Sequence, residues 1–233
     1  MFRFYKKNNG FILIPFLIVL PTFLIFLFST LMFWRIIQFK KERDHLCRTS
    51  SLQMNRQLAH SINDLLKMNP RAKSLRTQRH AAEKAFKVAK ASKNPQAIAL
   101  AFSFLQLTQS LQAQHRALQN QIQLKYQQQR NSSRQSLQRA FHKIKTDAQI
   151  IDPFSSLPMT TEGVETDSPT YRVNSLKIKN PLRVYWSSSA PHELQFIYKQ
   201  LQIKNHKING SCGSDIVKRR QKWTAELHAA KLS

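Results

Sequence analysis

Residues 11–34 read FILIPFLIVLPTFLIFLFSTLMFW and contain no charged residue. At about 1.5 Å of rise per residue, a helix of this length spans the ~30 Å hydrocarbon core of a bilayer. A helix is the expected form because it satisfies its backbone polar groups internally, without water. The rest of the chain is too polar to build a core around such a run. The sequence therefore predicts a membrane-spanning helix over this apolar run, which Arg35 ends, with membrane lipid as its first partner.

Positive charge is concentrated directly after this apolar run. The 233-residue chain has a formal net charge of +25, and residues 35–150 carry 22 basic and 5 acidic groups. A basic region beside a membrane segment favours anionic lipid, nucleic acid or an acidic protein as a partner. Composition alone does not separate these partners from a basic surface that is simply solvated.

The ten residues before the apolar run, MFRFYKKNNG, form a short basic leader. A secretory signal peptide has an apolar stretch of about 7–15 residues, followed by a cleavage site with small residues. The apolar run here is longer, and Phe33-Trp34-Arg35 is not such a site. We therefore expect residues 11–34 to remain in the protein as an anchor.

The junction between leader and anchor carries a family resemblance. Lys6-Lys7-Asn8-Asn9-Gly10 precedes Phe11, and residues 16–21 read FLIVLP. The junction resembles the class III signal of type IV pilins and pseudopilins, and is most similar to the TadE/TadG group of Tad-pilus pseudopilins. The resemblance covers about 25 residues of the 233. It implies cleavage between Gly10 and Phe11 by a prepilin peptidase, and packing of the apolar helix against other pilus or pseudopilin-like subunits in the inner (plasma) membrane.

Two prolines interrupt this pattern. Pro15 stands where the family carries a glutamate, five residues after the glycine, so a minor or tip subunit, or an uncut relative, fits better than a major repeating subunit. Pro21 removes a backbone donor and crowds the carbonyl four residues earlier, so a bend is expected there. Pro15 lies in the first turns, where the cost is smaller.

The orientation of the anchor is open at this level. The Lys and Arg count near the membrane ends favours a cytoplasmic location for the residues after Arg35. The pilin resemblance implies the opposite, with most of the chain outside the cytoplasm in the cell envelope. Two functions follow: a minor pseudopilin-like or assembly component, or a membrane-anchored basic module that binds a polyanion in the cytoplasm. Nucleic acid is disfavoured, because the basic, Gln-rich residues 106–138 have few aromatic residues to stack on bases, with Tyr126 and Phe141 the only rings nearby.

Residues 35–150 are predicted to be helical. Cys47, Met54, Leu58, Ile62 and Leu65 fall on one helical face. Asn69-Pro70 and Asn94-Pro95 each predict a capped helix start, which gives three helices in a hairpin or small bundle. The remaining apolar stripes are Ala72, Leu75, Ala82, Phe86 and Ala89, then Phe104, Leu111 and Leu118.

The C-terminal part is predicted to be a small antiparallel β unit, which makes the fold class α+β. Residues 151–170 are rich in Pro, Ser, Thr and acids, and predict a linker. Beyond it, residues 171–233 hold strand-like runs near 173–178, 182–186, 194–198 and 223–227, and a predicted turn at 209–214.

The chain has two cysteines, Cys47 and Cys212. Two are too few for a disulfide scaffold or a four-ligand zinc site, and the histidines lack metal-binding spacing. If the chain lies outside the cytoplasm, an oxidised pair would tie the β unit to the first helix. In the cytoplasm both would be free thiols. No metal, cofactor or catalytic residue is expected, since phosphate loops, dinucleotide fingerprints and nucleophile elbows are absent from the sequence.

Overall fold

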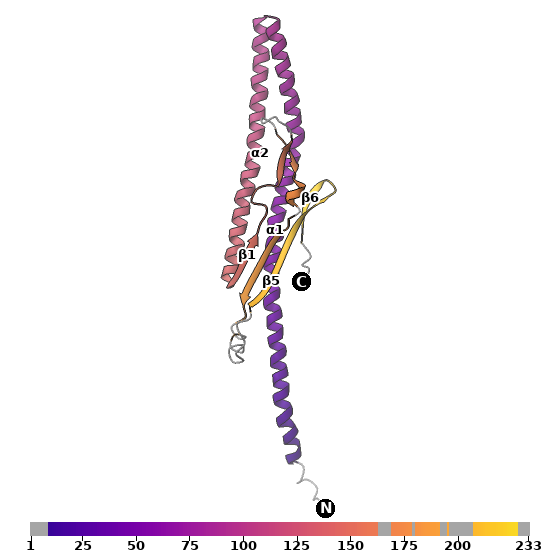
Figure 1. Cartoon of the computed structure of the whole chain (residues 1–233), viewed down its shortest axis with the longest axis vertical. Coiled ribbons are helices and arrows are strands. Elements are labelled where there is room, and N and C mark those ends of the chain that lie inside the picture. The colour runs from indigo at the N-terminus through magenta and orange to yellow at the C-terminus, as the bar shows by residue number, and fades with distance from the viewer. Residues whose placement is uncertain (1–8, 163–168, 179, 192–194, 196–206, 228–233) are drawn as a thin grey trace, which may run out of the picture. The chain divides into compact units, whose positions relative to one another are not determined.

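The computed structural model has an α+β fold, and it describes residues 9–162, 169–178, 180–191, 195 and 207–227. Two long helices and two antiparallel sheets dominate it (Figure 1). The elements are α1 (Asn9–Ala91), α2 (Pro95–Lys143), β1 (Thr146–Ile151), β2 (Met159–Glu162), β3 (Thr170–Val173), α3 (Ser175–Ile178), β4 (Leu182–Ser189), β5 (Lys207–Arg219) and β6 (Lys222–Leu227).

Helix α1 is one continuous element, so the predicted break at Asn69-Pro70 is wrong. The Asn69 side chain does not cap a helix. It bonds instead to the backbone of Tyr171 in β3. Pro70 removes one backbone donor, but buried Leu65 and Ala72 on either side keep the helix packed across that point.

The second predicted helix start is confirmed. After α1, the chain turns through Lys93, whose φ is 55°, and α2 begins with Pro95. The Asn94 side chain accepts hydrogen bonds from the backbone N–H groups of Gln96 and Ala97. This is the expected N-cap with proline at the first helical position. Helix α2 then runs back along α1, so the helices form a two-helix hairpin (Figure 1).

The larger sheet has the strand order β1-β4-β5-β6, and β2 and β3 form a separate antiparallel pair. Strands β5 and β6 pair antiparallel from Ser214 with Leu227 to Arg219 with Lys222. The predicted runs at 182–186 and 223–227 are therefore strands. The run at 194–198 lies outside the described residues except for Gln195.

Three expectations about the C-terminal part need correction. Residues 146–150, predicted to be helical, form strand β1 together with Ile151, and β2 lies inside the predicted linker. Leu176 and Ile178, predicted in a strand, fall in the short helix α3. The predicted turn at 209–214 lies within strand β5. Its glycine and serine residues have another use: they let this strand approach α1 closely, as glycine does in strands elsewhere.

The core lies between α1, α2 and the strands. Leu58, Ile62 and Leu65 of α1 pack with Tyr126 of α2 and Ile216 of β5. Phe154 and Leu157, from the predicted linker, belong to the same cluster. The predicted apolar face of α1 is confirmed, since all five of its residues are at most 1% exposed.

Candidate functional site: an exposed apolar helix and a helix–sheet junction

The first part of α1 is an exposed apolar surface. The twelve residues concerned are between 43% and 68% exposed: Ile18, Val19, Leu20, Phe23, Leu24, Ile25, Phe26, Leu27, Phe28, Leu31, Phe33 and Trp34. Among the described residues, α1 is the single helix long and apolar enough to cross a membrane, and its most apolar stretch is wholly unburied. Apolar side chains on all sides of a helix are suited to a lipid environment.

The hydroxyl groups in this segment are satisfied within the helix. Thr22 Oγ1 donates to the carbonyl of Val19 at 2.8 Å, and Ser29 Oγ donates to the carbonyl of Ile25 at 2.8 Å. The Thr30 hydroxyl likewise bonds to a carbonyl three residues earlier. Hydroxyls bonded back to the helix need no water, so these three residues do not oppose a membrane location.

A disulfide joins α1 to β5. Cys47 and Cys212 are bonded, with Cα atoms 6.0 Å apart and 165 residues between them in sequence. Both residues are buried, and Cys212 Sγ lies 3.8 Å from the Ser51 hydroxyl. The pairing expected for an oxidising compartment is therefore present, and no free cysteine remains in the chain.

One to two turns beyond the disulfide, a buried polar network continues the junction. Asn55 Nδ2 donates to the carbonyl and hydroxyl oxygens of Ser214, at 2.7 and 2.9 Å. The Ser214 hydroxyl donates to the carbonyl of Ser51 at 2.8 Å. Asn55 and Ser214 are fully buried. This network fixes the register of β5 against α1, because a shift of one residue would leave these groups unpaired.

The network extends to a buried ion pair between α2 and the residue after β1. Arg130 Nε and Nη2 donate to the two carboxylate oxygens of Asp152, at 2.7 and 2.6 Å, with side chains only 2% and 4% exposed. Asp152 also accepts from the N–H of Phe154 at 2.9 Å. Arg130 also reaches Asn55 Oδ1 at 3.4 Å. Such a bidentate, further hydrogen-bonded geometry is what a buried ion pair requires.

Tyr126 closes this part of the core. Its hydroxyl donates to the carbonyl of Phe154 at 2.7 Å. Burial raises the pKa of Tyr126 well above its ordinary value, and the charge of Asp152 adds to that rise, against the opposing effect of Arg130. The phenol therefore remains protonated and keeps its donor role in the core.

Two further asparagines of α1 bind strand backbone. Asn63 accepts from the N–H of Trp223 at 3.0 Å and donates to the same residue's carbonyl at 2.9 Å. Asn69 does the same with Tyr171, at 2.9 and 2.8 Å. With Asn55, these residues form an asparagine row along α1 that contacts β5, β6 and β3. The side-chain amides of this row bind backbone groups of the strands, as a neighbouring strand would.

The α2 side of the seam between the distal parts of α1 and α2 is polar. The α2 residues that it buries are Thr108, Gln112, His115 and Gln119, each at most 2% exposed. Gln112 accepts from Arg79 Nη1 at 3.2 Å, and Gln119 Nε2 donates to the carbonyl of Pro169 at 3.1 Å. The predicted α1 stripe is confirmed in part, since Ala72, Leu75, Ala82 and Ala89 are buried, whereas α2 buries these polar side chains in place of its predicted apolar stripe.

His115 is the titratable group in this seam. Burial lowers the pKa of His115 first, and the charge of Arg71 lowers it further, while the carbonyl of Met68 acts in the opposite direction. Its Nε2 lies 3.4 Å from Gln119 Nε2. The neutral imidazole is the form that this seam holds.

Two pockets are open grooves lined by both polar and apolar side chains. One, of about 390 Å³, is lined by Arg79, Arg116 and neighbouring α2 residues. Another, of about 450 Å³, runs between α1 and α2 past His60, Asp64 and Lys125. His60 Nδ1 lies 2.7 Å from Asp64. No group of three or more metal-binding side chains occurs among the described residues.

The predicted processing and kink residues lie at the beginning of α1. Gly10, Phe11 and Pro15 are helical in backbone, and Pro21 lies within the same uninterrupted helix. The leader before Asn9 lies outside the described residues. Cleavage after Gly10 and a bend at either proline remain predictions.

The comparisons with known proteins identify no relative. No family model, no curated protein and no solved structure matches this chain.

Several residues that organise the junction were not predicted from the sequence. Asn69 was interpreted as a cap, and Asn55 and Asn63 were not singled out. The available signal was their position: Asn55 and Asn63 lie close to the apolar face of a long helix, where an amide needs a buried partner. The sequence gave a weaker signal for the pairing of Arg130 with Asp152, because no sequence pattern links these two residues.

Proposed function

We propose that this protein is a single-pass membrane protein whose residues after the apolar segment lie outside the cytoplasm. We further propose that it acts as a minor pseudopilin-like or assembly component of the Tad/type IV class. The observation that carries the proposal is the Cys47–Cys212 disulfide in a chain with an exposed apolar N-terminal helix. Disulfides persist in oxidising compartments and are rare in the cytoplasm. The disulfide therefore supports an extracytoplasmic location more strongly than the Lys and Arg count supports a cytoplasmic one.

The architecture supports the same role. A long N-terminal helix, apolar at its beginning, later packs against an antiparallel sheet, which is the arrangement expected for a subunit built around one helix. The FLIVLP string and the Gly10-Phe11 junction add the family resemblance. The apolar segment would pack against the helices of sister subunits, and the junction would hold the folded part to the same helix.

Pro15 limits the role to a minor or accessory subunit. The acid that the family carries at this position is thought to neutralise the terminal amine of a neighbouring subunit during assembly. Proline offers neither charge nor a backbone donor there. A subunit incorporated once, or at an end, does not need that contact repeated.

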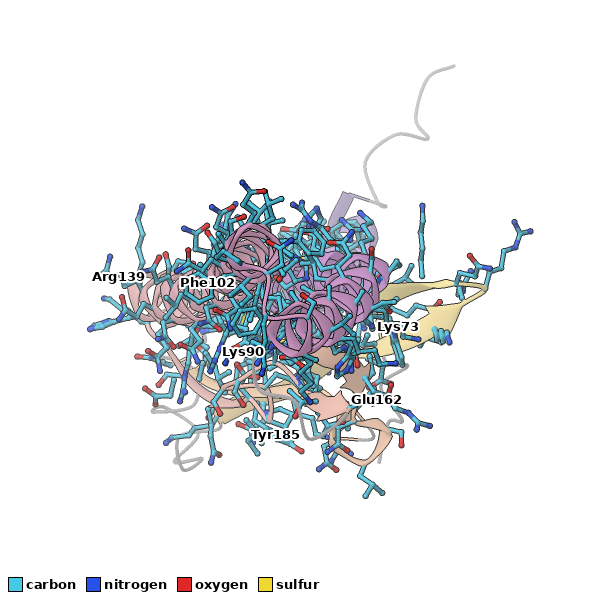
Figure 2. All side chains as sticks on the ribbon, turned by 90° about the horizontal axis from the view of Figure 1, so that it is seen from above. Lys73, Lys90, Phe102, Arg139, Glu162 and Tyr185 are labelled. Atoms are coloured by element: carbon cyan, nitrogen blue, oxygen red, sulfur yellow. A yellow bond between two sulfur atoms is a disulfide. The ribbon has the colours of Figure 1, made fainter. Side chains whose placement is uncertain are left out.

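The polyanion-binding alternative retains one supporting observation. Residues 70–93 of the hairpin carry eight basic groups and one acidic group, hence a charge of +7. Lys73, labelled in Figure 2, is one of these basic groups and is exposed. In this alternative the chain would face the cytoplasm, both cysteines would be reduced, and binding would weaken steeply with salt.

One experiment separates the two functions. The protein is purified from its native membranes without reductant, and its mass and N-terminal residue are determined before and after reduction and alkylation. An N-terminus at Phe11 with both thiols inaccessible before reduction is the expected result. An intact Met1 with two alkylatable thiols would overturn the pseudopilin proposal and leave the cytoplasmic basic module.

A further inference from the structure

Helix α2 leaves an apolar stripe exposed. Its four clearly exposed members are Leu100, Phe104, Leu107 and Leu118, at 72%, 44%, 57% and 46%, and half-buried Leu111 lies on the same line. The spacings of 4, 3, 4 and 7 residues place all five on one side of the helix over about 27 Å. This is the periodicity of a seam between two helices.

The stripe is not the side that α2 turns to α1. The intramolecular seam contains Thr108, Gln112, His115 and Gln119, offset from the stripe by roughly a quarter of a turn. The chain thus buries the polar side of α2 and leaves much of the apolar side in solvent. An apolar line of this length on a folded surface marks an interaction site.

Other exposed apolar residues of the hairpin do not belong to the stripe. Phe102 is labelled in Figure 2, and its ring centroid lies 5.7 Å from that of Phe86 in α1. Leu124 falls well off the line of the stripe by helical spacing. The stripe is therefore one narrow seam rather than an apolar surface around the whole helix, which favours a helix over a lipid surface as its occupant.

The charge distribution identifies the kind of helix. Residues 94–115 contain no Lys, Arg, Asp or Glu, although 21% of the chain is charged. Arg116, the next charged residue, lines the pocket that includes Arg79 and Gln109, away from the stripe. By contrast, residues 70–93 carry a charge of +7, so two copies approaching through that part of α1 would repel each other.

We infer that the α2 stripe is a self-association surface that pairs with the α2 stripe of a second copy of this chain. The stripe is apolar and periodic, and four of its five residues lie in the charge-free segment 94–115, so it is complementary to itself, as a two-fold interface requires. An acidic partner helix would be drawn to the basic α1 instead, and it would not need a charge-free α2. This inference does not rest on the proposed function, since it concerns a different surface.

The test uses the full chain in detergent and measures its association by sedimentation. Leu107→Glu with Leu118→Glu places two carboxylates in the stripe. Gln109→Glu with Asn120→Glu adds the same charge on exposed pocket-lining positions. We expect the first variant to associate at least about a hundredfold more weakly than wild type, because each copy loses two buried leucines. The control variant should match wild type.

A folding check and a direct probe complete the test. Both variants should retain the native disulfide and helical circular dichroism, which excludes unfolding as the cause. Because both native cysteines are already bonded, Leu107→Cys and Gln109→Cys each introduce a single free thiol. Under mild oxidation, Leu107→Cys should form covalent dimers and Gln109→Cys should not.

Three results would overturn the inference. The first is a monomeric wild-type chain. The second is equal association of the stripe and control variants, which would assign self-association to another surface such as the apolar N-terminal segment. The third is that the stripe substitutions leave self-association unchanged and instead weaken binding to an acidic helical peptide or to anionic vesicles. Failure here would leave the N-terminal processing result unaffected, so the two proposals can fail separately.

Discussion

Removal of the Cys47–Cys212 disulfide tests how the sheet is held to α1. We consider Cys47→Ala with Cys212→Ala, which breaks the bond without introducing a buried hydroxyl. The bond closes a loop of 165 residues. In the chain-entropy model, a loop of this length lowers the entropy of the unfolded chain by about 17 cal/mol/K, or about 5 kcal/mol at 25 °C. This is an upper value, since real unfolded chains are already compact.

The expected loss in the free energy of unfolding is therefore about 3–5 kcal/mol, close to the typical range for a native disulfide. It is a large share of the ~5–15 kcal/mol that stabilises most domains. The assay is urea unfolding of the full chain in detergent, followed by tryptophan fluorescence, because Trp186 is only 2% exposed and reports on the sheet.

The single variants provide the internal control. Either cysteine alone can be replaced, and each replacement breaks the same bond. The two single losses and the double loss should then be nearly equal rather than additive. A loss below about 1 kcal/mol would refute the reasoning. It would mean that the asparagine row and the buried ion pair already hold the sheet without the covalent link.

Three further predictions concern groups in the same core. Asp152→Ala leaves Arg130 buried without its partner and should lower the free energy of unfolding by about 3–5 kcal/mol in urea titrations; a loss near zero would contradict the buried pairing. Asn69→Ala strands the backbone N–H and carbonyl of Tyr171 and should cost about 2 kcal/mol, with faster amide exchange in β3 as the specific readout. His115 has a lowered pKa in the folded state, so the unfolded chain binds the proton more readily. The contribution of His115 to the free energy of unfolding should be fully present above about pH 6.5. It should be lost as the pH falls, by at most about 1.4 kcal/mol per pH unit, as measured in thermal melts. His115→Gln should flatten that part of the pH profile.

The sequence predicted the features whose signals are local. The face from Cys47 to Leu65 follows helical spacing and is buried as expected. The dipeptide Asn94-Pro95 is enough to indicate a helix start, and α2 begins there in the structure. The alternation of Leu182, Val184 and Trp186 is a strand pattern, and all three side chains are buried in β4.

The features that the sequence did not reveal depend on distant partners. Asn69-Pro70 has the same local chemistry as Asn94-Pro95, yet its amide is taken up by a strand about a hundred residues away. The apolar spacing of α2 predicted its seam, but the helix buries the polar line beside it. Local preference was overridden in both cases by hydrogen bonds that no local pattern specifies.

The strand-like segment at 209–214 shows the same limit. Glycine and serine around Cys212 are typical of a turn, and the sequence alone gives no reason to prefer a strand. The structure instead pairs this segment with α1, where the Ser214 hydroxyl donates to the carbonyl of Ser51 at 2.8 Å. The position of the disulfide could be predicted, but the conformation that carries it could not.

The asparagine row has a consequence for how this chain can be cut and recombined. Because Asn63 binds the backbone N–H and carbonyl of Trp223, a helix residue occupies that point on the outer edge of β6. A fragment that begins at residue 171 would lack this partner and would present a bare strand edge to any neighbouring chain. The C-terminal strands therefore cannot be expressed or exchanged as an independent unit. A useful truncation has to keep α1 from about residue 46 onward.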